Sequence, residues 1–295
     1  MKKTIFYGSA VALITPMNQD YSVNYEKLKE LVNWQIENKT DAIVACGTTA
    51  ESATLSEEEK LNVIKTIKQQ AQNKVPIIAG TGSNNTKTTI EFSKKAKDLS
   101  VDAILVVTPY YNKASQSGLL KHYNQIADYV DIPVIVYDVP SRTGCKIESK
   151  TFSKLKNNQN IVAVKAASGD MSQISKIAAD CKDELKIYSG DDGLITPIMS
   201  IGGAGVISVL ANILPKQTHE ICELYLKNNP QKSAKLQLEL LELINTLFVE
   251  VNPIPVKAAM NLMGLNVGPC RMPLSEIDDE KLEVLKKVLK KYNLI

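Results

Sequence analysis

The stretch Asn160-Ile161-Val162-Ala163-Val164-Lys165-Ala166 decides which fold the sequence predicts. Its β-branched and small apolar residues are typical of a strand buried on both faces. The run ends in Lys165, and only small residues follow at positions 166–169. A charged lysine at the end of a buried strand is unfavourable unless it is paired or its tip reaches water. Lys165 is therefore either a lysine that reaches the surface or a functional group.

Seven further strand patterns surround this one, and helical patterns separate them. The eight predicted strands are Phe6–Ala12, Ala42–Cys46, Pro76–Ala79, Ala103–Val107, Val134–Tyr137, Ile161–Lys165, Lys186–Ser189 and Gly205–Ser208. The helical patterns cover Tyr25–Asn38, Glu57–Gln72, Thr86–Leu99, Gly118–Val130, Ser149–Lys156, Met171–Cys181, Gly193–Ile201 and Pro215–Lys227. Strict alternation of strand and helix favours an α/β fold of the (β/α)8, or TIM-barrel, type over an open doubly wound sheet.

The last part of the chain loses the strand signals. Three helices are expected there, at Ser233–Val249, Pro255–Met263 and Asp278–Tyr292. We therefore divide the 295 residues into a (β/α)8 catalytic barrel at 1–228 and a C-terminal α-helical domain, or extension, at 229–295.

Composition excludes several classes of protein. The formal net charge is +3, too small to indicate binding to nucleic acid or to an anionic membrane. No run reaches the roughly 18 apolar residues of a membrane span, and the N-terminus lacks the apolar core of a signal peptide. The five cysteines are scattered, with no metal-ligand spacing, which argues against a zinc site or a disulfide framework. We expect a cytoplasmic protein.

Polar residues gather where the predicted strands end. The second strand leads into Gly47-Thr48-Thr49-Ala50-Glu51-Ser52, whose hydroxyls and backbone N–H groups suit a carboxylate or another small anion. The fifth strand ends at Tyr137, with Arg142 five residues later, and the sixth ends at Lys165. Barrel enzymes place their chemistry at this carboxyl-terminal end. We therefore expect Thr48, Tyr137 and Lys165 to face one mouth, with the amine of Lys165 within hydrogen-bond reach of Tyr137.

This arrangement predicts carbonyl chemistry. Burial disfavours the charged form of a lysine, so a neutral amine can attack a carbonyl and form a Schiff base. A neighbouring phenol can carry the protons that dehydration of the carbinolamine requires. The phenol of Tyr137 needs hydrogen-bonding partners for this, and Thr48 and a tyrosine from the loop after the fourth strand would serve.

The chain resembles the dihydrodipicolinate synthase family, also called 4-hydroxy-tetrahydrodipicolinate synthase, along its whole length. The segments that carry the resemblance are 47–52 (GTTAES), 107–113 (VTPYYNK), 137–144 (YDVPSRTG), 164–165 (VK), 189–192 (SGDD), 205–209 (GVISV) and 252–257 (NPIPVK). The resemblance implies that Lys165 forms a Schiff base with pyruvate. It also implies a proton relay of Thr48, Tyr111 and Tyr137, in which Tyr111 reaches across from a neighbouring subunit.

The same resemblance assigns substrate contacts. Thr48 and Thr49 would hold the carboxylate of pyruvate, and Arg142 that of L-aspartate 4-semialdehyde, for which a planar bidentate donor is better suited than lysine. Gly190 and Ile207 would line the pocket. No metal or organic cofactor is implied, since the covalent Schiff base on Lys165 carries the substrate. The family is usually a homotetramer, a dimer of dimers.

Three positions depart from the commonest family pattern. Ala50 stands where glycine is usual, so the loop is expected to sit slightly differently, because a methyl disfavours positive φ. Ala166 stands where glutamate is common, and Asp138 replaces a frequent asparagine. None of these removes a proposed chemical group.

A lysine-binding regulatory site is present only in part. Ser52, Ala53, Asn84 and Tyr110 match the site that lysine-inhibited relatives carry. Glu57, Lys60 and Thr88 do not match it, since responsive relatives carry His, His and Glu there. We expect weak or no feedback inhibition, because the acid that would hold the effector's ammonium is missing and Lys60 adds a like charge.

Two other functions remain alternatives. N-acetylneuraminate lyase and the 2-keto-3-deoxy sugar-acid aldolases share the barrel, the threonine loop, the tyrosine and the lysine. Arg142 favours a short substrate with a carboxylate instead. A catalytically silent barrel would lack at least one of Thr48, Tyr137 and Lys165, and all three are present.

Overall fold

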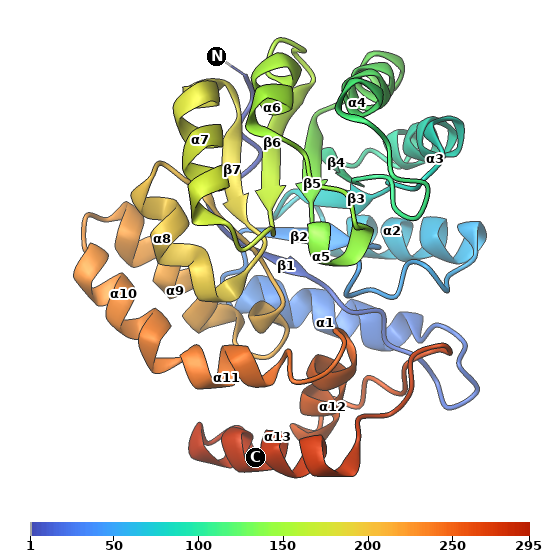
Figure 1. Cartoon of the computed structure of the whole chain (residues 1–295). Coiled ribbons are helices and arrows are strands. Elements are labelled where there is room, and N and C mark those ends of the chain that lie inside the picture. The colour runs from blue at the N-terminus through green and yellow to red at the C-terminus, as the bar shows by residue number, and fades with distance from the viewer. Residues whose placement is uncertain (1) are drawn as a thin grey trace.

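The computed structural model describes residues 2–295 and contains a closed barrel of eight parallel strands, each paired with the next and β8 with β1 (Figure 1). The strands are β1 (Gly8–Ala12), β2 (Ala42–Ala45), β3 (Ile77–Gly80), β4 (Ala103–Val107), β5 (Val134–Asp138), β6 (Ile161–Ala166), β7 (Lys186–Ser189) and β8 (Gly205–Ser208). The predicted (β/α)8 barrel is confirmed, and every predicted strand is present with its ends within two residues of the prediction.

Helices connect successive strands and cover the outside of the barrel. They are α1 (Tyr25–Glu37), α2 (Glu57–Ala71), α3 (Thr86–Asp98), α4 (Gln116–Val130), α5 (Pro140–Thr143), α6 (Ser149–Leu155), α7 (Met171–Cys181), α8 (Ile195–Ser200) and α9 (Pro215–Leu226). The sequence did not predict the four-residue α5, which begins at Pro140 and ends at Gly144 in the left-handed region (φ 64°). This short helix carries Arg142, so it bears on the site described below.

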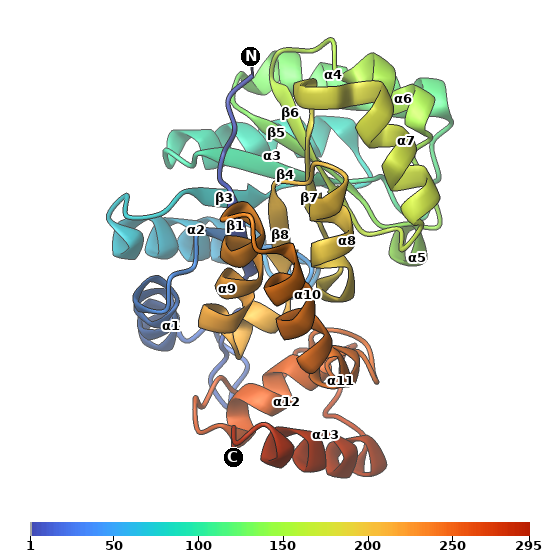
Figure 2. The same ribbon diagram turned by 90° about the vertical axis from the view of Figure 1, so that its left-hand side faces the viewer.

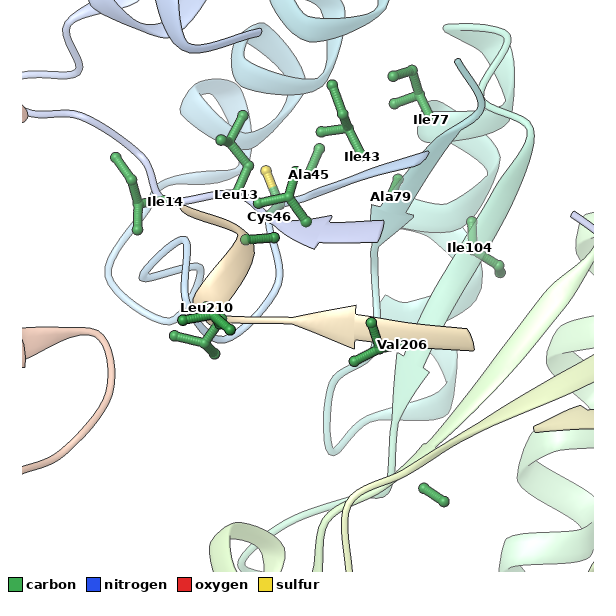
Figure 3. Close-up of a cluster of buried hydrophobic side chains, with 14 of the residues drawn as sticks. Leu13, Ile14, Ile43, Ala45, Cys46, Ile77, Ala79, Ile104, Val206 and Leu210 are labelled. Atoms are coloured by element: carbon green, nitrogen blue, oxygen red, sulfur yellow. The ribbon is translucent and has the colours of Figure 1, made fainter. Parts of the chain in front are cut away.

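Alternation along each strand separates two apolar clusters. One set of side chains faces outward and packs beneath the helices. Figure 3 shows part of this outer cluster, with Ile43, Ala45, Ile77, Ala79, Ile104 and Val206 labelled. The other set fills the barrel interior and includes Ala10, Val44, Ile78, Leu105, Tyr137, Tyr188 and Ile207. Lys165 is two residues from the inward-facing Ala163, so its side chain also enters the interior.

The C-terminal segment is helical, as predicted, but is divided differently. Its helices are α10 (Pro230–Glu239), α11 (Leu241–Thr246), α12 (Ile254–Leu262) and α13 (Asp279–Lys291). The prediction of one helix over Ser233–Val249 is wrong, because α10 ends at Glu239 and α11 begins at Leu241, with the buried Leu240 between them. The domain boundary at residue 228 stays a prediction.

The C-terminal helices gather at one side of the barrel. In both views α11–α13 lie far from the N-terminus (Figures 1 and 2), and in Figure 1 the arrowheads of β6 and β7 point toward them. They therefore lie at the carboxyl-terminal end of the strands, where the candidate site is located.

Candidate active site

Lys165 lies inside the barrel and touches Tyr137. The strand register pairs Tyr137 with Lys165 directly, and the lysine is only 6% exposed. Its Nζ lies 4.3 Å from the centroid of the Tyr137 ring, a cation–π arrangement. The expected contact is confirmed. The expected hydrogen bond is not formed, since the amine faces the ring and no hydrogen bond within residues 2–295 joins it to the phenol.

The stem of Lys165 needs a glycine beside it. A Cβ added at Gly190 would lie 3.1 Å from both Cγ and Cε of Lys165 and 2.7 Å from Cβ of Ala167. Any side chain at position 190 would therefore crowd the lysine stem as well as Ala167. Ile207 belongs to the same interior cluster. These two predicted pocket residues thus line the space that Lys165 enters.

Residues 47–52, which we call the hydroxyl loop, follow β2. Two backbone bonds turn the loop, from Ala50 N to Gly47 O (3.2 Å) and from Glu51 N to Thr48 O (3.1 Å). Thr48 is half-buried, whereas Thr49 is buried. The left-handed residue is Glu51 (φ 56°), and Ala50 is not among the positive-φ residues. The strain argument for a displaced loop therefore does not apply, because the position of Ala50 does not require glycine.

A cavity of about 330 Å³ opens beside this loop and brings several predicted residues together. Its lining includes Thr48, Ser52, Ala53, Tyr110 and Arg142. A hydroxyl and a guanidinium facing one cavity favour an anionic ligand. Lys165 on β6 and Tyr137 on β5 do not line this cavity. Their side chains lie inside the barrel.

The segment after β5 presents Arg142 to the cavity. Its NH2 donates to the backbone carbonyl of Asn252 (3.1 Å), which leaves the other guanidinium donors free for a ligand. Just before this segment, the buried Asp138 accepts hydrogen bonds from Ile147 N (3.1 Å) and Gln173 Nε2 (3.2 Å). Burial raises the pKa of Asp138 to about 6, despite these bonds.

The predicted proton relay is not connected within the single chain. Tyr111 is 91% exposed and has a positive φ of 71°. No hydrogen bond in the described part of the chain joins Thr48, Tyr111 and Tyr137. The relay therefore stays a prediction.

The partial regulatory site divides between the cavity and its rim. Ser52, Ala53 and Tyr110 line the cavity, and so does Lys60. Asn84 lies on the next loop, where its carbonyl accepts from Asn112 Nδ2 (2.9 Å). Its role as part of a site stays a prediction.

Sequence reasoning missed the contribution of the C-terminal extension to this site. Asn252 lines the cavity, and its Nδ2 donates to Thr49 Oγ1 (3.0 Å). Lys257 pairs with Glu51 of the hydroxyl loop (2.7 Å). More than 200 residues separate the partners in each contact, so no local pattern reports them. The one available signal was a lysine within a mostly apolar helix.

Two searches of residues 2–295 complete the description. No helix there combines the length and apolarity that a membrane span requires. No group of three or more His, Cys, Asp or Glu side chains is placed to hold a metal ion. All five cysteines are free, and burial raises the pKa of Cys46 to about 12.

Comparison with known proteins gives a consistent result. The model of the dihydrodipicolinate synthetase family matches residues 5–292. The 4-hydroxy-tetrahydrodipicolinate synthase of Clostridium perfringens is 54% identical over 291 residues, which cover 99% of this chain and all of the relative.

Solved structures agree. The dihydrodipicolinate synthase of Acinetobacter baumannii, chloride-inhibited and complexed with pyruvate, is 44% identical with a TM-score of 0.97, covering 99% of this chain and 100% of that one. The enzyme of Cyanidioschyzon merolae with lysine bound is 36% identical with a TM-score of 0.96, at the same coverage. The chain, with its lysine-bearing barrel, therefore belongs to the dihydrodipicolinate synthetase family.

Proposed function

We propose that this chain is a lyase that condenses pyruvate with L-aspartate 4-semialdehyde to 4-hydroxy-tetrahydrodipicolinate, the first committed step of lysine and diaminopimelate biosynthesis. The observation that carries the proposal is the placement of Lys165. Its amine is buried at the carboxyl-terminal end of β6, over the ring of Tyr137 and against the space that Gly190 leaves open. A structural lysine requires none of these neighbours.

The reaction begins at the amine of Lys165. The neutral amine attacks the ketone carbon of pyruvate, and loss of water gives a Schiff base. Loss of a methyl proton gives an enamine, whose carbon attacks the aldehyde of the second substrate. The amino group of that substrate then displaces Lys165 and closes the ring. One water is released overall and the lysine is regenerated, so the chemistry requires no metal or organic cofactor.

The two substrate carboxylates have separate positions in this proposal. Thr48 and Thr49 of the hydroxyl loop hold the carboxylate of pyruvate. Arg142 faces the cavity from the other side and holds the carboxylate of the semialdehyde, which supports a short acidic substrate over a sugar acid.

The proton relay in this proposal requires a second subunit. The exposure of Tyr111 supports this, because a side chain that is 91% exposed in one chain is available to a neighbour. Tyr111 would complete the relay with Thr48 and Tyr137 of the neighbouring subunit, in a homotetramer built as a dimer of dimers. The free cysteines fit a reducing cytoplasm. Sedimentation at micromolar concentration tests the assembly, and a monomer with full activity would contradict it.

A coupled assay separates the candidate activities. We expect consumption of pyruvate only when L-aspartate 4-semialdehyde is present, and no cleavage of N-acetylneuraminate or of 2-keto-3-deoxy sugar acids. Borohydride with pyruvate should leave a reduced adduct on Lys165, found by peptide mass. Cleavage of N-acetylneuraminate as the faster reaction, or the lack of an adduct, would overturn the proposal.

We also propose that L-lysine inhibits this enzyme weakly or not at all. The cation of Lys60 lines the cavity beside Ser52, Ala53 and Tyr110, near Asn84 on the next loop, and would repel the effector's ammonium. Half-inhibition well below one millimolar would contradict this expectation.

A further inference from the structure

The hydroxyl loop is held from outside the barrel by two contacts. The first is made by Asn252, which precedes α12 and is 5% exposed. Its side-chain Nδ2 donates to Thr49 Oγ1 (3.0 Å), and its backbone carbonyl accepts from Arg142 NH2 (3.1 Å). One residue of the extension thus touches both groups that are assigned to substrate carboxylates.

The second contact is a buried ion pair. Lys257 Nζ lies 2.7 Å from Glu51 Oε1, and the two side chains are 2% and 0% exposed. The pair is well satisfied, since Lys257 also donates to Thr15 O (3.3 Å) and Glu51 Oε2 accepts from Arg271 N (2.7 Å). Glu51 takes a left-handed conformation that few non-glycine residues adopt, and this ion pair is placed to hold it there.

Together these contacts hold the loop at two positions, Thr49 and Glu51. Thr49 is fixed through its own hydroxyl, and Glu51, two residues later, is fixed through its carboxylate. Thr15 Oγ1 donates to the intervening Ala50 carbonyl (2.8 Å). The geometry of Thr48 and of the loop's N–H groups therefore depends on a segment about 200 residues away in sequence.

We infer that Asn252 is a positioning residue, through which the C-terminal extension sets the hydroxyl loop for the carboxylate of pyruvate. This inference rests on the proposed function. Its side-chain bond serves the pyruvate side alone, because the contact to Arg142 uses the backbone carbonyl, which any residue at position 252 retains. Loss of the Asn252 side chain should therefore affect the binding of pyruvate and not that of the semialdehyde.

The test measures the KM of each substrate in Asn252→Ala. We expect the KM for pyruvate to rise about three- to tenfold, the range for one lost hydrogen bond, while the KM for the semialdehyde changes less than twofold. Asn252→Ala and Thr49→Val remove the same bond, so the double variant should be no worse for pyruvate than the poorer single variant.

A matched control comes from the same extension. Among the described residues, the side chain of Asn261 in α12 forms hydrogen bonds only with residues 267 and 268. Asn261→Ala should lower the melting temperature and leave both KM values unchanged. A loss of folded enzyme alone would lower the apparent kcat without separating the two KM values, so it cannot imitate the expected result.

A failure of this inference can be distinguished from a failure of the proposed function. If the wild-type chain traps pyruvate on Lys165 and Asn252→Ala leaves the KM for pyruvate unchanged, or raises both KM values equally, the inference is wrong and the function stands. Strict additivity with Thr49→Val would also overturn it. If the wild-type chain forms no adduct, the proposed function itself fails.

Discussion

At the amino-terminal end of the barrel, the ring of Tyr188 stacks on that of Phe6 with centroids 4.2 Å apart, and its hydroxyl donates to the Phe6 carbonyl (2.8 Å). Asp41, at the same end, accepts from Ser9 N and pairs with His219. At the carboxyl-terminal end, by contrast, the hydroxyls of Thr48 and Tyr137 have no hydrogen-bond partner within residues 2–295. Arg142 there uses only one nitrogen in a hydrogen bond to the described part of the chain.

The difference follows from what each end must do. A closed end contributes most when its polar groups are satisfied, since an unpaired buried group costs about 1–3 kcal/mol. Ser9 Oγ is an exception at this end, because it is buried without a hydrogen-bond partner within residues 2–295. An end that binds ligands must leave donors free until the ligand arrives, and the remaining structure must hold them in place. The amino-terminal end therefore serves stability, and the carboxyl-terminal end serves chemistry.

The sharpest way to test this contrast is to remove the amine. Lys165→Met should lower kcat/KM by at least about a thousandfold, because no other group can form the Schiff base. The fold should be unharmed, since a buried amine is replaced by an apolar side chain of similar length. Steady-state assays and melting curves measure the two effects. Activity within tenfold of the wild type would show that Lys165 is not the nucleophile.

At the amino-terminal end we expect the reverse, a loss of stability without a loss of activity. Phe6→Ala should cost about 3–5 kcal/mol of unfolding free energy, because it removes a large buried ring and its stacking contact with Tyr188. KM values for both substrates should be unchanged in the folded fraction. Urea unfolding gives the stability, and a shift in either KM would show that the two ends are coupled.

Asp138 gives the carboxyl-terminal end its own pH dependence. Its pKa is raised from 3.8 to about 6 by burial, so the folded state holds the proton more tightly than the unfolded chain does. Stability should therefore fall as pH rises from about 4 to about 6, by about 2–3 kcal/mol. Asp138→Asn should flatten the curve of melting temperature against pH in this window. An unchanged curve would mean that another group is responsible.

Arg142 tests whether the two carboxylates bind independently. Arg142→Ala should raise the KM for the semialdehyde about 10- to 100-fold, as expected for lost bonds to a charged group, and leave the KM for pyruvate unchanged. Arg142→Lys should recover only part of the loss, since an ammonium cannot form a bidentate pair. Equal effects on both substrates would contradict separate positions.

The smallest effect is expected at His219. Its hydrogen bond to Asp41 (2.8 Å) raises its pKa. The stabilisation is complete below the unfolded pKa of about 6.5 and is lost as pH rises through the folded value. His219→Ala should remove this dependence and leave activity intact. Urea midpoints at pH 6 and pH 9 measure it, and a wild-type midpoint that does not fall would refute the expectation.

Much of the barrel could be predicted because its signals are local. Each strand is a short apolar run with a helix pattern beside it, and the alternation limits the topology to few choices. The pairing of Tyr137 with Lys165 followed from neighbouring strands. The break at Leu240 was missed because the apolar pattern continues through it. The helix α5 was missed because four residues are too few to show a helical periodicity.

The site was less predictable where it depends on distant groups. The direction of the Lys165 amine, toward the ring of Tyr137 and away from its hydroxyl, depends on side-chain packing. The contacts of Asn252 and Lys257 form only when the extension folds onto the barrel, so spacing within either segment cannot reveal them.

The buried pair of Glu51 and Lys257 constrains how this chain can change over generations. Removing either partner leaves a charge inside the protein, at a cost of about 3–5 kcal/mol against a total stability of about 5–15 kcal/mol. A chimera that joins this barrel to an extension without a cation at position 257 would be destabilised by that amount. The barrel and its extension are therefore expected to be inherited together, and a lineage that neutralises one position must neutralise the other.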